Sequence, residues 1–266
     1  MDIVILPGAE QVASYGAALV RRVIRDTSRP VLGLATGSTP LALYRRLIAD
    51  CEQGELSFQD VTTFNLDEYL GIRRENPQSY HAYMRRELFD HVDIDPANTW
   101  LPECGEGKSP LEVGPAYEER IREAGGIDLQ LLGIGANGHI GFNEPASSLS
   151  SRTRIKTLTR ATVEANRQYF DDQEEQPELA ITMGIGTILD TREILLLATG
   201  AAKAAAVRDA IEGPVSAACP ASALQLHQRV TVLLETEAAA ALESRDYYEG
   251  VQEQKQRLVN EQGGPR

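Results

Sequence analysis

The chain has 266 residues, 42% of them hydrophobic, and a formal net charge of −13, which is a composition typical of a soluble globular protein. So strong a negative charge argues against nucleic acid and acidic membrane surfaces as partners, because both would repel it. The sequence has no apolar run of membrane-spanning length and no signal-peptide pattern at its N-terminus, so we expect a cytoplasmic protein.

Short apolar strand patterns alternate with helix patterns along the chain. The predicted strands are residues 3–6, 31–36, 61–66, 127–135, 193–200 and 230–235. Helix patterns follow them near 9–26, 41–47 and 77–90, after 200 and after 235. Because the strands are nearly unbroken apolar runs separated by helices, the sequence predicts an α/β fold with an open, mostly parallel sheet and helices on both faces.

No linker and no internal repeat divide the chain, so we expect one domain over residues 1–266 with a polar C-terminal end from about Ser244. The acidic run at 171–178 is typical of a solvated loop. Three cysteines, Cys51, Cys104 and Cys219, form neither a metal-binding spacing nor an even disulfide set, so we expect them to be reduced.

Four polar stretches each follow a predicted strand directly. They are TGSTP (36–40), DEY (67–69), GANGHIGFNEP (135–145) and TGAAK (199–203). Ligands of open parallel sheets bind beyond the carboxyl ends of the strands, so these four stretches predict one shared site.

TGSTP and TGAAK have the features of phosphate-binding turns. Thr39 and Pro40 suit an N-cap and a first helical residue, and Gly37 permits a turn that exposes backbone N–H groups to an anion. An ordinary capped helix explains this stretch equally well. Lys203, in the first turn of the next predicted helix, opposes the helix dipole unless an anion lies between them, although an exposed lysine is the simpler explanation.

DEY and GANGHIGFNEP contain the groups suited to acid–base chemistry. A carboxylate with restricted access to solvent can act as a general base, although acids at a helix N-terminus are also common. His139 lies among four glycines, and Asn137 and Glu144 are near enough in sequence to orient it. Most histidines are structural, but the position of this loop after a strand favours catalysis.

Taken together, these residues resemble the glucosamine-6-phosphate deaminase family, which is isomerising and releases ammonia. The matching segments are LGLATGSTP (32–40), FNLDEYLG (64–71), GIGANGHIGFNEPASSL (133–149), SRTRIKTLT (151–159) and ALQLH (223–227). The resemblance implies a Rossmann-like fold, no metal or organic cofactor, and conversion of glucosamine 6-phosphate and water to fructose 6-phosphate and ammonia. It also implies that Asp67 is the base that moves a proton from C2 to C1, and that His139, supported by Glu144, opens the sugar ring.

The resemblance extends to binding positions and shows two departures. The family's phosphate contacts fall on Gly37, Ser38, Thr39 and Lys203. Many members have aspartate at the position of Asn137, which leaves the pH optimum open, and a phosphate-binding arginine of the family aligns with Gln168, with Arg167 one place earlier. Either Arg167 takes over that contact or the contact is missing.

SRTRIKTLT resembles the members that are hexamers activated by N-acetylglucosamine 6-phosphate. Ser147, Arg154 and Lys156 match their effector-phosphate positions. On a strand, Arg154 and Lys156 would point to the same face, which suits a phosphate, although an exposed basic strand is common. The resemblance therefore implies a homo-oligomer with an allosteric site.

Two other functions fit the same fold. Sugar-phosphate sensing modules of transcription regulators bind without turnover, but they accompany a DNA-binding segment. The acidic charge and a first strand at the beginning of the chain lead us to expect none. Hydrolysis of a sugar-phosphate lactone needs no base at C2, so it would not explain Asp67 and His139 together.

Overall fold

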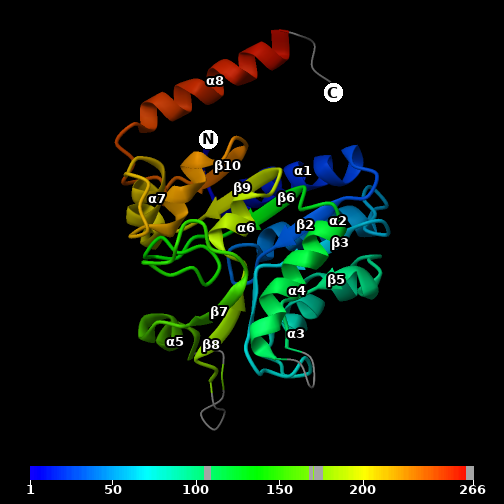
Figure 1. The fold of residues 1–266 in the computed structure, drawn as a ribbon. Coiled ribbons are helices and arrows are strands. Elements are labelled where there is room, and N and C mark those ends of the chain that lie inside the picture. Colours follow the sequence, from blue (N-terminus) through cyan, green and yellow to red (C-terminus); the bar gives the residue numbers. More distant parts are fainter. Residues whose placement is uncertain (105–108, 168–169, 171–175, 262–266) are drawn as a thin grey trace.

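The computed structural model describes the chain except for residues 105–108, 168–169, 171–175 and 262–266. A seven-stranded sheet forms its centre (Figure 1). In spatial order the strands are β1 (Asp2–Leu6), β10 (Val230–Glu235), β9 (Glu193–Ala198), β6 (Leu129–Leu132), β2 (Val31–Leu34), β3 (Thr62–Asn65) and β5 (Thr99–Trp100). Every pairing in this sheet is parallel, which confirms the predicted open, parallel α/β sheet.

Helices cover both faces of this sheet, as its unbroken apolar strands require. The helices are α1 (Ala9–Asp26), α2 (Leu41–Glu52), α3 (Tyr80–Glu87), α4 (Pro110–Glu123), α5 (Arg160–Asn166), α6 (Ile185–Leu189), α7 (Ala204–Ile211) and α8 (Arg245–Glu261). A Cβ placed on Gly16 of α1 would lie 2.7 Å from Leu43 of α2 and 3.6 Å from Leu197 of β9, so α1 and α2 pack together against the sheet. On the opposite face, Tyr117 of α4 packs edge-on against Phe64 of β3.

A second, three-stranded sheet was not predicted from the sequence. It consists of β4 (Asp67–Tyr69), β8 (Leu179–Thr182) and β7 (Arg154–Thr157), with β8 in the middle and both pairings antiparallel. DEY therefore forms a strand rather than the loop or helix start that its sequence suggested. The small sheet packs on a hydrophobic cluster of its own, which includes Tyr69, Phe142 and Phe170.

The last helix, α8, contacts the edge strand β1 and projects from one side of the molecule (Figure 1), and its residue Tyr248 donates to Glu212 at 3.2 Å. Gln252 donates to the Ile3 carbonyl at 3.0 Å and to Asp2 at 2.6 Å, and Lys255 pairs with Asp2 at 2.7 Å. These contacts occupy part of an otherwise unpaired strand edge. Among the described residues, no helix is long and apolar enough to cross a membrane.

Two helix starts differ from the prediction. α2 begins at Leu41 with Pro40 as its N-cap residue, and no side chain caps it, so Thr39 is not the N-cap. The reason is a turn closed by Leu41 N donating to Ser38 O at 3.4 Å, which delays the helix by one residue. Lys203 ends a short 3-10 turn (Ala201–Lys203) and precedes α7, so it lies just before the helix rather than in its first turn.

Candidate active site

The four polar stretches lie together at the carboxyl ends of the strands of the larger sheet. They follow β9, β6, β2 and β3, which are four neighbouring strands of the larger sheet, and their carboxyl ends meet because the strands are parallel. From β2 the chain runs on to β3 and β5, whereas from β6 it runs on in the other direction to β9 and β10. The point between β2 and β6 is therefore the topological switch point, where open α/β sheets bind their ligands.

At three positions of the 133–145 loop, only a glycine leaves enough room for a neighbouring group. A Cβ on Gly135 would lie 2.3–2.4 Å from the His139 ring, so only glycine leaves room for the ring there. Gly138 has φ +80° and faces Cys219 Sγ, which would lie 2.5 Å from an added Cβ. Gly141 has φ +55°, and its added Cβ would lie 3.3 Å from Asp67 Oδ2. The glycines thus bring the backbone close to the histidine and to the carboxyl group.

Glu144 gathers the polar groups of this loop. Asn137 Nδ2 donates to Glu144 Oε2 at 2.7 Å, Thr162 Oγ1 donates to Oε1, and His139 Nδ1 lies 3.5 Å from Oε2. Burial raises the pKa of Glu144, but the nearby His139 and hydrogen bonds from Thr162 and Asn137 outweigh it and lower that pKa to about 2. Glu144 is therefore an anion at neutral pH, placed to orient His139.

Asp67 and Glu68 are both buried, with 6% and 3% of their surfaces exposed. Glu68 accepts three backbone N–H groups, from Tyr69, Tyr80 and His81, each at 2.9 Å, and so fixes the start of α3. Burial, and next the charge of Glu68, raise the pKa of Asp67 to about 8. Asp67 is thus a carboxyl group that can exchange a proton near neutral pH, next to the loop that carries His139.

The two predicted phosphate turns flank this loop on either side. Gly37 has φ +98°, and its carbonyl accepts a hydrogen bond from Tyr83 Oη at 2.6 Å. Ser38 is exposed and Thr39 half-buried. Lys203 is half-buried, desolvation lowers its pKa, and its side chain forms no hydrogen bond or ion pair within the described part of the chain. The turns are separated by one strand, β6, a gap of about 10 Å between β2 and β9.

The predicted effector residues lie beside the small sheet. Arg154 and Lys156 are on β7, as a strand was expected to place them. Ser147 is 2% exposed, and its Oγ has no hydrogen-bond partner among the described residues. Gln168, the departure from the phosphate-binding arginine, lies outside the described residues, and the exposed Arg167 has contacts of its own.

Three polar side chains of the site escaped sequence reasoning. Thr162 binds Glu144, Thr182 accepts from Phe142 N at 3.1 Å, and Asn143 donates to the carbonyls of Ile140 and Met183. Asn143 belongs to the GANGHIGFNEP stretch, so its position next to Glu144 could have indicated a role in the site. Thr162 of α5 and Thr182 of β8 come from distant segments, which only the fold brings together here.

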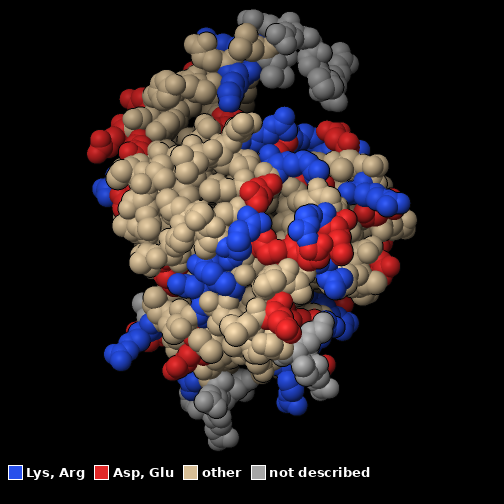
Figure 2. Space-filling view, viewed as in Figure 1, with Lys and Arg blue, Asp and Glu red and all other residues tan. Residues whose placement is uncertain are grey.

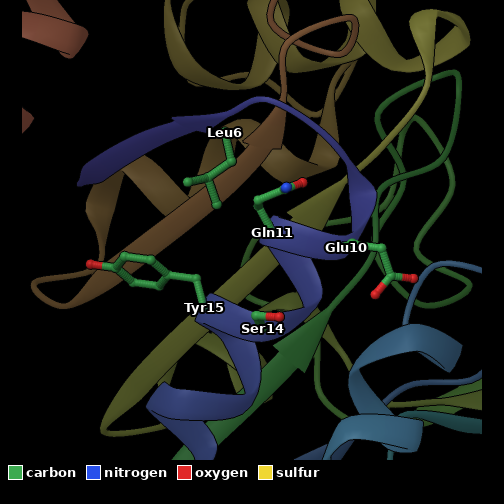
Figure 3. Close-up of a pocket in the computed structure, with 5 residues that line it drawn as sticks. All are labelled: Leu6, Glu10, Gln11, Ser14 and Tyr15. Carbon is green, nitrogen blue, oxygen red and sulfur yellow. The ribbon is translucent and has the colours of Figure 1, made fainter.

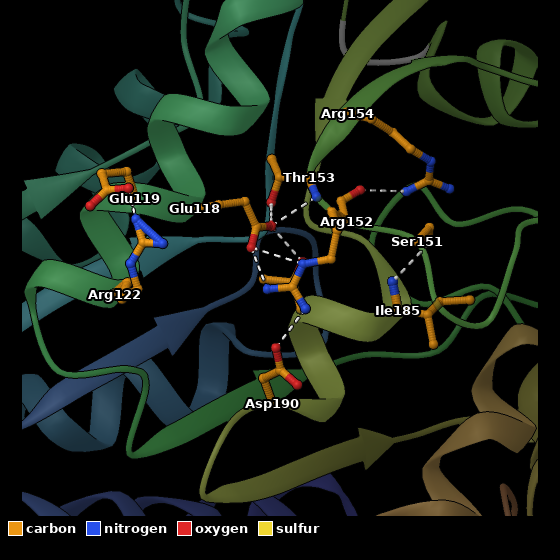
Figure 4. Close-up of polar contacts among 10 residues, drawn as sticks. Glu118, Glu119, Arg122, Ser151, Arg152, Thr153, Arg154, Ile185 and Asp190 are labelled. Carbon is orange, nitrogen blue, oxygen red and sulfur yellow. Dashed lines mark hydrogen bonds and ion pairs between the residues drawn. The ribbon is translucent and has the colours of Figure 1, made fainter.

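A second polar cluster fixes the start of β7 (Figure 4). Glu118 of α4 accepts from Thr153 N at 2.8 Å and from Thr153 Oγ1, Thr187 Oγ1 and Arg152, and Arg152 also pairs with Asp190. These groups satisfy one another, so the cluster anchors the strand and is not a binding site.

Two hollows in the described part of the chain lie near the edge strand β1, and neither is lined by a predicted site residue. The hollow in Figure 3 is lined by Leu6, Glu10, Gln11, Ser14 and Tyr15, at the edge strand β1, and contains none of the predicted site residues. Within the described part of the chain, no three His, Cys, Asp or Glu side chains gather as metal ligands.

Comparisons with known proteins identify relatives of this chain. Residues 8–233 match the family of glucosamine-6-phosphate isomerases/6-phosphogluconolactonase. The glucosamine-6-phosphate deaminase of Hahella chejuensis is 57% identical over 258 residues, covering 97% of this chain and 98% of the relative. That of Colwellia psychrerythraea is 55% identical over 263 residues, covering 99% and 98%.

A solved structure shows the same fold. It is described as a monomeric glucosamine-6-phosphate deaminase and superposes with a TM-score of 0.87 at 44% identity, covering 91% of this chain and all of that one. With relatives this similar over almost the whole length, the chain belongs to the glucosamine-6-phosphate deaminase family of enzymes.

Proposed function

We propose that this protein converts glucosamine 6-phosphate and water to fructose 6-phosphate and ammonia, as a single-domain cytoplasmic enzyme. The observation that carries the proposal is the contact between Asp67 and the loop of His139. Asp67 Oδ2 faces Gly141, which is two residues after His139. A proton-exchanging carboxyl group and an oriented histidine therefore lie at the same switch point, which is what isomerisation of an amino sugar requires.

In the proposed reaction, the open-chain sugar has an aldehyde at C1 and an amino group at C2. Asp67 removes the C2 proton while O1 takes up a proton from water, which gives an enolamine, and Asp67 then returns its proton to C1. The C2 carbon is then an imine, water adds to it, and the C2–N bond breaks to release ammonia and leave the C2 ketone. Asp67 is suited to both proton transfers because its raised pKa makes the acid and base forms close in free energy near neutral pH.

His139 is proposed to open the pyranose ring before this step. It takes the proton from the O1 hydroxyl and donates one to the ring oxygen. Glu144, held as an anion by Thr162 and Asn137, orients the ring from its Nδ1 side and leaves Nε2 for the sugar. Asn137 is neutral, so it contributes a hydrogen bond to Glu144 and no charge.

The substrate phosphate is proposed to lie between the turn of Gly37, Ser38 and Thr39 and the side chain of Lys203. Lys203 is half-buried and has no anionic partner among the described residues, so a bound phosphate would supply its missing counter-charge. The two turns stand on either side of the catalytic loop, which places a sugar held at its phosphate across Asp67 and His139.

A second anion site is proposed at Ser147, Arg154 and Lys156, with N-acetylglucosamine 6-phosphate as effector. The buried hydroxyl of Ser147, which has no partner among the residues that the structure describes, and two cations on one strand support it. We further propose a homo-oligomer, a hexamer. Residues 145–151 and 213–226 contain no charged side chain, and a broad uncharged area lies on the left in Figure 2 over α7 and the neighbouring loops. Val215 and Leu226 are 39% and 65% exposed, which suits contact with a second copy.

The test is ammonia release by the purified protein. We expect glucosamine 6-phosphate to give equal amounts of ammonia and fructose 6-phosphate, and Asp67→Asn to abolish both. Glucosamine tests the need for the phosphate, and 6-phosphogluconolactone tests the lactonase alternative. Hydrolysis of the lactone without ammonia release from the amino sugar would reject the proposal.

A further inference from the structure

Asn143 is a fully buried side chain that joins three segments of the molecule. Its Nδ2 donates to the carbonyl oxygens of Ile140 at 2.9 Å and of Met183 at 2.8 Å. Its Oδ1 accepts a hydrogen bond from Arg154 Nη1 at 2.9 Å. The loop of His139, the end of β8 and the strand β7 therefore meet at one amide group.

The orientation of this amide is fixed by its partners. Two carbonyl oxygens require the NH₂ end, so the oxygen must face the guanidinium group of Arg154. Reversing the amide would set oxygen against the carbonyls of Ile140 and Met183 and nitrogen against Arg154. The contact with Arg154 and the contacts with the loop are thus made or lost together.

Asn143 also lies between the two residues proposed for ring opening. Ile140 directly follows His139, and Glu144 directly follows Asn143. A shift of the Asn143 side chain therefore acts on the backbone beside both His139 and Glu144.

Arg154 has the properties of a group that responds to an anion. Burial lowers its pKa, and its described partners are the neutral oxygens of Asn143 and of Arg152, the latter at 3.3 Å. Arg152, two residues earlier, is instead neutralised by Glu118 and Asp190. In Figure 4 the Arg154 side chain extends away from that acidic cluster. Of the two arginines, Arg154 is the one that retains an uncompensated charge within the described part of the chain.

We propose that Asn143 is a positioning residue of the deamination site and transmits the binding state of Arg154 to His139 and Glu144. An anion that draws the guanidinium group changes the hydrogen bond that Asn143 Oδ1 accepts, and the fixed amide passes the change to the Ile140 carbonyl. This inference rests on the proposed function and adds to it the group that links the effector site to the catalytic loop.

The experiment is a double-mutant cycle on the full-length enzyme without effector, using Arg154→Ala, Asn143→Ala and the double variant. Leaving a buried polar group unpaired should lower kcat by about tenfold or more in each single variant, with KM changed by less than about threefold. Because both changes break the same link, the double variant should be no slower than the slower single variant. Multiplied effects in the double variant, or an Arg154→Ala enzyme with kcat within about twofold of the unmutated value, would overturn the inference.

A second pair of variants separates positioning from general damage to the fold. Asn143→Asp places carboxylate oxygen against two carbonyls and gives Arg154 an anionic partner. We expect lower kcat and binding of N-acetylglucosamine 6-phosphate weakened about tenfold or more, because the effector must then displace an ion pair. Asn98→Asp, which adds the same charge on the distant turn before β5, should change neither. Unweakened effector binding and normal kcat in Asn143→Asp would contradict the inference.

Measurements of ammonia release and effector binding by the unmutated enzyme distinguish a failure of the proposed function from a failure of this inference. If it releases no ammonia, the proposed function fails. If it releases ammonia but binds no effector, only the effector site fails, and the kcat cycle still decides whether Asn143 positions the loop. Should Asn143→Ala fail to fold, Arg154→Ala, which truncates a half-buried side chain, carries the kcat test alone.

Discussion

Asp67 and Arg154 pair with the same residue, Thr182, from opposite sides of β8. Residues in register across neighbouring strands point to the same face, so the three side chains form one row, with about 10 Å between the outer backbones. Thr182 Oγ1 accepts a hydrogen bond from Phe142 N in the catalytic loop. The small sheet therefore lies against the loop and connects the proposed base with the proposed effector cation.

The raised pKa of Asp67 predicts the pH dependence of the reaction. The base must be ionised in the free enzyme, so kcat/KM should increase about tenfold per pH unit below its pKa and level off above about pH 8. Glu68→Gln removes the charge that is the second cause of the shift, after burial, so the midpoint should move to lower pH. Rates measured from pH 5 to 10 decide this, and a midpoint that does not move in Glu68→Gln would contradict the assigned cause.

The same shift predicts a pH dependence of stability. A carboxyl group whose pKa is higher in the folded than in the unfolded state favours folding while protonated, and that contribution is lost as pH rises through the folded pKa of about 8. The side chain introduced by Asp67→Asn cannot ionise, so this loss is absent in the variant. The difference in free energy of unfolding between the variant and the unmutated protein should therefore shift in favour of the variant by about 1.4 kcal/mol per pH unit between pH 4 and 8. Urea unfolding at several pH values measures the difference, and parallel stability curves would argue against a buried, protonated Asp67.

Gly135 and Gly133 form a matched pair for testing the His139 ring position. A Cβ on Gly135 would overlap the ring, whereas a Cβ on Gly133 has nothing within 4 Å. Gly135→Ala should displace the ring and lower kcat by about 100-fold, the size of a lost acid–base contribution, and Gly133→Ala should retain normal turnover. Equal rates for the two variants would show that the ring position does not matter for turnover.

Lys203→Ala tests the phosphate site. Removing the half-buried cation should raise KM for glucosamine 6-phosphate far more than for glucosamine, because only glucosamine 6-phosphate has a phosphate that the lysine can contact. Lys255→Ala serves as control, since Lys255 of α8 pairs with Asp2 at the start of β1, away from the carboxyl ends of the strands. An equal loss for both sugars would mean that Lys203 contributes only packing or general charge.

The sequence predicted the parallel sheet and the shared edge because apolar runs alternate with helix patterns and the polar stretches follow the strands. It missed the antiparallel sheet, since β4 has three residues and the other two strands, β8 and β7, lie far along the chain. Thr162 and Thr182 were missed for the same reason, because a threonine carries no local signal of a distant partner. Thr39 was misassigned because the Ser38–Leu41 turn competes with the cap, a choice that residue types alone do not decide.

The effector site predicts cooperative kinetics. A net charge of −13 repels anions at long range, so a phosphate is retained only by close cations such as Arg154 and Lys156. If the effector binds the active conformation better, it shifts the equilibrium by its differential affinity, typically about 1–3 kcal/mol. Substrate saturation should be sigmoidal alone and hyperbolic with N-acetylglucosamine 6-phosphate. Lys156→Ala should abolish this change and Lys255→Ala should preserve it. Hyperbolic saturation in the unmutated enzyme, unaffected by the effector, would show that the basic strand has no regulatory role.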